Sequence, residues 1–144
     1  MIPSIPLRDV LPSSVLRVTL KPPFMVIPQS VTQGVQYLGL RRPRTHRGMY
    51  RSQFIGIIDR NDSVNKIIAF RIIDMRSVGV PTSSDIVFAI LEVRYADLLR
   101  AQVFRPATRM APEVVVTTVQ QFARIGQAGK LPPTFVPSAP VLIT

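Results

Sequence analysis

The chain has 144 residues, of which 47% are hydrophobic and 18% charged, a length and composition typical of one folded domain with one core. It carries 18 Lys and Arg against 8 Asp and Glu, a net charge of +10, and has no Cys, which excludes disulfides and thiolate metal sites. Its apolar runs are shorter than the ~18 residues of a membrane-spanning helix, and its first residues lack the pattern of a signal peptide.

The N-terminal half begins with predicted extended structure. Residues 1–13 hold three prolines and predict an extended arm. Ser14–Leu20 alternates apolar and polar residues, the period of a half-buried strand. Phe24–Ile27, bounded by prolines, predicts at most a short edge strand, because proline cannot donate to a strand ladder. Val35–Leu40 is the next strand candidate.

A basic loop follows directly. Between Val10 and Ile58 there is no Asp or Glu, and five arginines lie within Arg41–Arg51. Such a cluster cannot neutralise itself, so it either stays solvated or binds phosphates or carboxylates of another molecule. Nucleic acid, an acidic protein partner and plain solvation all remain open. The expected binding residues are Arg41, Arg42, Arg44, Arg47, Arg51 and Tyr50, whose ring can stack on a base.

A central hairpin is predicted next. Gln53–Asp59 and Lys66–Ile73 are rich in Ile and flank Arg60–Asn65, whose small polar residues favour a turn. This turn also resembles the start of a calcium loop, but Val64 and Phe70 stand where such a loop needs Gly and Glu. The turn therefore explains these residues better than a metal site does.

Helices are predicted in the C-terminal half. Good helix formers run through Leu91–Gln102, after possible N-caps at Ser83 and Ser84, while 86–90 could be helix or strand. A second helix over 112–125 fits the apolar spacing, although the β-branched run at 114–119 favours a strand.

The tail, residues 129–144, is rich in proline yet apolar, which suits an arm laid on a neighbour, or equally a segment packed on its own domain. The expected architecture is α+β, mainly β: an arm (1–13), a single domain (14–128) of about five short strands around a central hairpin with one or two helices in its C-terminal half, and a Pro-rich arm (129–144). The expected arm contacts are Ile2, Ile5, Leu7, Leu131, Phe135, Val136, Val141, Leu142 and Ile143.

Catalytic groups are scarce in the sequence. The only His, His46, lies among arginines that disfavour its protonated form. No nucleotide-binding glycine loop and no paired carboxylates are recognised. We therefore expect no enzyme, no catalytic residues, no metal and no cofactor.

These patterns favour a non-enzymatic structural subunit of a large assembly, with a capsid or other virion component as the preferred case. Its arms would tie neighbouring subunits together, and its Arg loop would bind RNA, DNA or an acidic partner. The alternative is an RNA-binding subunit of a ribonucleoprotein, such as a ribosomal or mitoribosomal protein. A small enzyme acting on an anionic substrate is a third class. The expected location is a virion or an intracellular assembly.

Overall fold

The computed structural model describes residues 3–44, 52–73, 88–106 and 135–144. Within them the regular structure consists of strands and two short 3-10 helices. The strands are β1 (Ile5–Pro6), β2 (Val15–Leu20), β3 (Met25–Thr32), β4 (Val35–Arg41), β5 (Gln53–Asp62), β6 (Ile67–Ile72), β7 (Phe88–Arg94), β8 (Leu98–Pro106) and β9 (Phe135–Leu142); the 3-10 helices are η1 (Leu7–Asp9) and η3 (Tyr95–Asp97).

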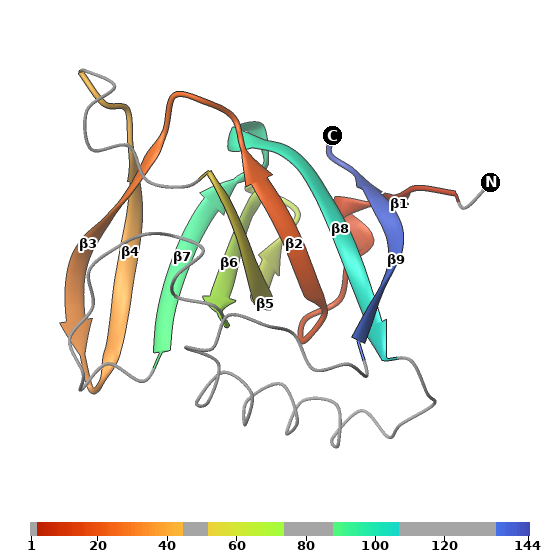
Figure 1. Ribbon diagram of the computed structural model, residues 1–144, viewed down its shortest axis with the longest axis horizontal. Helices are drawn as coiled ribbons and strands as arrows, with labels where there is room; N and C mark the ends of the chain where they lie inside the picture. Colours follow the sequence, from red (N-terminus) through yellow and green to blue (C-terminus); the bar gives the residue numbers. More distant parts are fainter. Residues whose placement is uncertain (1–2, 45–51, 74–87, 107–134) are drawn as a thin grey trace.

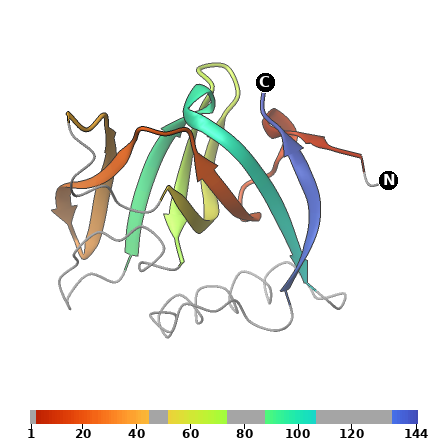
Figure 2. The ribbon, with the colours of Figure 1, turned by 45° about the horizontal axis from the view of Figure 1, so that its top comes forward.

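The strands form one curved sheet in the order β1-β9-β8-β2-β5-β6-β7-β4-β3 (Figure 1). β1 is parallel to β9 and β4 is parallel to β7, while every other neighbouring pair is antiparallel. β3 lies at one edge of the sheet, and β1 and β9 lie together at the other (Figures 1 and 2). Strands from both ends of the chain therefore belong to one sheet.

One face of the sheet carries the main core. In β2 the side chains of Leu16, Val18 and Leu20 are buried in it, as the alternation of the sequence predicts. At its centre the rings of Phe54 and Phe70 meet edge to face, with centroids 5.4 Å apart and planes at 81°. The opposite face has a smaller apolar cluster, made by Val15, Ile57, Ile73 and Phe104.

Several sequence predictions are confirmed. Ser14–Leu20 contains β2, Val35–Leu40 lies within β4, and the predicted hairpin is formed by β5 and β6, which occupy the middle of the strand order. β3 is an edge strand as expected, but it extends to Thr32. A bulge between Pro28 and Ser30 interrupts its register with β4, which lets the strand continue past a residue that has no N–H.

The turn of the hairpin is closed by Asp62. Its carboxylate accepts hydrogen bonds from the backbone N–H of Asn65 at 3.0 Å, from the Asn65 side-chain amide at 2.8 Å and from the backbone N–H of Val64 at 3.2 Å. These bonds, that of the Asn65 N–H first, lower the pKa of Asp62 below its ordinary value. The polar residues of this segment thus serve the turn.

The prediction of an α+β fold with about five strands and one or two helices is wrong. The described residues form one nine-stranded sheet and contain no helix of seven or more residues. The expected helix Leu91–Gln102 is instead the end of β7, the turn η3 and the start of β8. Tertiary pairing overrides helix propensity here, because β7 and β8 each bury alternate residues against neighbouring strands. The second predicted helix, 112–125, lies outside the described residues, as does 114–119; of 86–90, the residues from Phe88 onward are strand.

One side chain, that of Asn61, connects the segment between β1 and β2 to the sheet. The Asn61 amide, in β5, donates to the carbonyl oxygens of Leu7 and Val10, both at 2.9 Å, and its own oxygen accepts from the Tyr95 hydroxyl. Burial raises the pKa of Tyr95 above its ordinary value of 10.0. Asn61 therefore ties η1, β5 and η3 together.

Candidate functional site

The described part of the basic loop presents exposed guanidinium groups. Arg41 ends β4, and Arg42 and Arg44 follow it; all three are exposed. The Arg42 guanidinium lies over the ring of buried Phe24, 5.6 Å from its centroid. This cation–π contact places the loop against the connection between β2 and β3. Arg47, Tyr50 and Arg51 lie outside the described residues.

Charges are distributed unevenly over the described residues. Four carboxylates pair with arginines: Asp9 with Arg8 at 4.0 Å, Glu92 with Arg60 at 3.4 Å, Asp59 with Arg71 at 3.0 Å and Asp97 with Arg94 at 3.2 Å. The fifth, Asp62, is engaged in the hairpin turn. The arginines without a carboxylate partner in the described part of the chain are Arg17, Arg41, Arg42, Arg44, Arg100 and Arg105.

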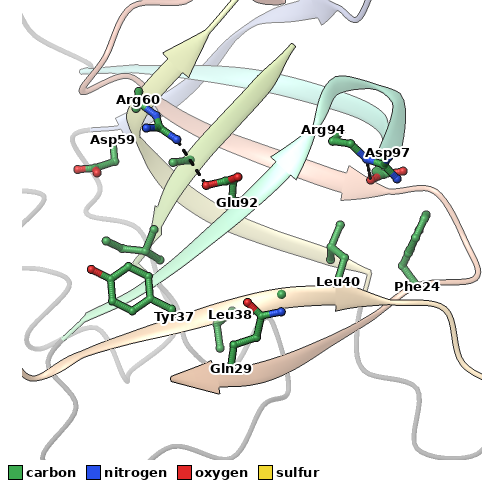
Figure 3. Close-up of a pocket in the computed structure, with 13 residues that line it drawn as sticks. Phe24, Gln29, Tyr37, Leu38, Leu40, Asp59, Arg60, Glu92, Arg94 and Asp97 are labelled. Carbon is green, nitrogen blue, oxygen red and sulfur yellow. Dashed lines mark hydrogen bonds and ion pairs between the residues drawn. The ribbon is translucent and has the colours of Figure 1, made fainter. Parts of the chain in front are cut away.

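A cleft of about 650 Å³ opens where β4 and β7 diverge (Figure 3). The two strands pair only as far as Leu38 and Leu91, although both continue for three more residues. Phe24, Leu38 and Leu40 give the cleft an apolar lining, and on the neighbouring strand the Gln29 amide occupies the space beside Gly39. A side chain at position 39 would collide with this amide.

The charged groups of the cleft compensate one another. The ion pairs Arg60–Glu92 and Arg94–Asp97 lie at its rim, as the dashed lines in Figure 3 show. Asp59, which also lines the cleft, is paired with Arg71. The cleft therefore has no excess of one charge, in contrast to the basic loop.

Two further unpaired arginines were missed by the sequence analysis as site residues. Arg17 in β2 and Arg100 in β8 line a second hollow, on the face of the sheet opposite the main core. Arg17 was visible as the polar member of an alternating strand. Arg100 was not, because its segment was expected to be helical.

The predicted arm residues differ in how far they are buried. Leu7 and Val141 are buried in the domain's own core, and Ile5 and Ile143 pack at its margin. The exposed members are Val136, 43% exposed, and Leu142, 51% exposed. Phe135 begins β9. Ile2 and Leu131 lie outside the described residues. Among the described arm residues, the buried members thus contribute to the sheet, and exposed ones such as Val136 and Leu142 are left to contact a neighbour.

Among the described residues, no three His, Asp or Glu side chains lie close enough to hold a metal ion, and no helix could cross a membrane. Comparison of the chain with known protein families, curated proteins and solved structures gives no match.

Proposed function

We propose that this protein is a non-enzymatic structural subunit of a larger assembly, such as a virion shell, and that its cationic surface binds nucleic acid. The cationic surface comprises the exposed arginines Arg41, Arg42 and Arg44, at the end of β4 and directly after it.

The observation that carries the proposal is that these arginines have no carboxylate partner among the described residues. The described Asp and Glu side chains are used in ion pairs or in the hairpin turn, so none of these described carboxylates is a counterion of the cationic surface. An uncompensated guanidinium gains most from an anion supplied by another molecule, and its planar donors match phosphate oxygens. The net charge of +10 adds long-range attraction for a polyanion.

The assembly role is supported by the two ends of the sheet. β3 is the last strand at one edge of the described sheet, and its Val31 side chain is exposed. At the other end β1 pairs with β9 at Val141 and Leu142, and no other described strand pairs with that side of β9 from Phe135 to Pro140. Open edges with exposed apolar side chains are surfaces that another chain can pair with.

The nucleic-acid role is tested with the triple variant Arg41→Ser, Arg42→Ser, Arg44→Ser. Its control is Arg8→Ser, Arg60→Ser, Arg105→Ser, which removes the same charge from elsewhere on the described surface. Fluorescence anisotropy measures binding of single-stranded RNA and DNA of about 16 nucleotides, with polyglutamate as the acidic-protein probe. We expect the loop variant to lose at least about tenfold in nucleic-acid affinity, and the control to change it less than about threefold.

Equal nucleic-acid affinities for the wild type and both variants would overturn the nucleic-acid role. Preferential binding of polyglutamate would overturn it too, and would assign the loop to an acidic protein partner. The assembly role is tested by analytical ultracentrifugation of the wild type and the variant Val136→Ser, Leu142→Ser. Oligomers that the variant loses support the role, whereas a wild type that is monomeric with and without nucleic acid contradicts it.

A further inference from the structure

A second hollow, of about 450 Å³, lies on the sheet face opposite the main core and spans β5, β2, β8 and β9. Its described polar lining consists of two arginines, two glutamines and one threonine, with no carboxylate among these described residues. The residues that line it are Arg17, Thr19, Gln53, Arg100, Ala101, Gln102, Pro140 and Val141.

Strand register brings these polar side chains together. Thr19 in β2 lies opposite Gln53 on one side and opposite Arg100 on the other, and Arg17 lies opposite Gln102. Residues opposite one another project from the same face, and the diagonal pair Arg17 and Arg100 has a separation of about 7–8 Å, within reach of long side chains. The Arg17 guanidinium lies over Phe104, which is opposite Val15, whereas Arg100 is opposite Thr19. The two guanidinium groups can therefore each meet a different phosphate of one strand.

Arg17 is held in place before any ligand arrives. Its guanidinium lies 5.1 Å from the centroid of the Phe104 ring, and the side chain is half-buried. The stacking restricts its rotamers, and neighbouring apolar residues reduce screening by water. Arg17 nevertheless has no carboxylate partner among the described residues, so this ordered charge is left for an external anion.

The hollow adjoins the point where the basic loop returns to the sheet. The backbone N–H of Leu20 donates to the carbonyl oxygen of Ser52 at 2.7 Å, and the next residue, Gln53, lines the hollow. Ser52, the described residue that precedes β5, therefore lies beside the hollow, while Arg42, which follows β4, lies over Phe24.

We infer that this hollow binds the phosphate backbone of the nucleic-acid strand, with Arg17 and Arg100 each contacting one phosphate and Thr19, Gln53 and Gln102 supplying further hydrogen bonds. This inference rests on the proposed function. A phosphodiester fits better than a carboxylate, because its oxygens and the adjoining sugar and base offer acceptors to the hydroxyl and amide donors as well as to two guanidinium groups.

The test uses the variant Arg17→Gln, Arg100→Gln and, as its charge-matched control, Arg8→Gln, Arg105→Gln. Binding of the oligonucleotide is measured over a range of salt concentrations. We expect the hollow variant to bind the oligonucleotide at least about tenfold more weakly. The magnitude of the slope of the logarithm of the association constant against the logarithm of salt concentration should fall by about 1.4, the value for two single-strand phosphate contacts. The control should keep the wild-type slope.

A second variant, Gln102→Glu, tests the site without removing either arginine. It places a carboxylate opposite Arg17, so it should weaken oligonucleotide binding while leaving the urea midpoint unchanged or higher. This variant decides the question if the double arginine variant fails to fold.

Wild-type binding by both the double variant and Gln102→Glu would overturn the inference, while a loss in the Arg41, Arg42, Arg44 variant would leave the proposed function standing. NMR titrations of the arginine side chains with inorganic phosphate and uridine monophosphate separate a strand from a free anion. If these small anions shift the Arg17 and Arg100 signals but the oligonucleotide does not, the hollow is a free-phosphate site and the inference is wrong.

Discussion

Replacing Asn61 by aspartate removes the two hydrogen bonds from its side chain to the segment between β1 and β2, and changes almost nothing in side-chain shape. The amide donates to the carbonyl oxygens of Leu7 and Val10 at 2.9 Å each, and an ionised carboxylate cannot donate to either. The Leu7 carbonyl oxygen keeps its bond from the Val10 N–H at 3.0 Å, so its loss costs about 0.5–1.5 kcal/mol, while losing the bond to Val10 costs about 1–2 kcal/mol. We therefore expect a loss of about 1.5–3.5 kcal/mol in the free energy of unfolding near neutral pH.

Urea denaturation followed by circular dichroism measures this loss, and the m-value reports whether the folded state stays compact. Acidification should restore part of the stability difference from the wild type, because the introduced carboxyl group, once protonated, can donate one hydrogen bond. Tyr95→Phe removes only the bond to the Asn61 oxygen and should cost about 0.5–1.5 kcal/mol. A loss below about 0.5 kcal/mol for Asn61→Asp would show that Asn61 does not anchor the segment.

Three further predictions concern single positions. Gly56→Ala should destabilise the fold by about 1–3 kcal/mol in urea denaturation, because its Cβ would lie 3.1 Å from the Arg71 carbonyl oxygen, a backbone atom; an unchanged midpoint would contradict this. Gln36→Leu should stabilise by about 1 kcal/mol, since the Gln36 side-chain oxygen is buried without a hydrogen-bond partner in the described structure; a loss of stability would contradict it. Burial raises the folded-state pKa of Tyr95 above 10.0, so its contribution is complete below that pH and is lost as pH rises through the folded-state pKa. From about pH 8 to about pH 12 the wild type should therefore lose more stability than Tyr95→Phe, and parallel curves would refute the reasoning.

The sequence predicted the middle of the sheet well and its C-terminal half poorly. The hairpin of β5 and β6 has dense Ile runs on both sides of a polar turn, and this sequence pattern is typical of a β-hairpin. Leu91–Gln102 was misinterpreted because Glu, Arg, Ala and Leu favour helices, although Leu91, Val93 and Tyr95 already alternate with polar residues as in a strand.

β9 was also missed as a strand because of Pro137 and Pro140. It pairs along its length with β8, while β1 covers its other side only at Val141 and Leu142. A residue without an N–H is tolerated in a strand with one open edge. This position depends on pairing with distant residues, which local composition does not reveal.

The two parts of the candidate site also differ in how far the sequence predicts them. The basic loop is visible in the sequence, because its arginines are close together and no acid lies near them. The hollow of Arg17 and Arg100 depends on the register of β2 against β8, whose residues are far apart in the chain. No motif or residue spacing in the sequence therefore indicates that these two arginines lie on neighbouring strands.

The most direct test of the proposed function is the salt dependence of single-stranded nucleic-acid binding between about 50 and about 200 mM salt. If the cationic surface binds phosphates, the logarithm of the association constant should fall linearly with the logarithm of salt concentration for the wild type. The variant Arg41→Ser, Arg42→Ser, Arg44→Ser should lower that slope by about 2, the value for three single-strand phosphate contacts. A wild-type slope near zero, or the same slope in the variant, would contradict the proposal.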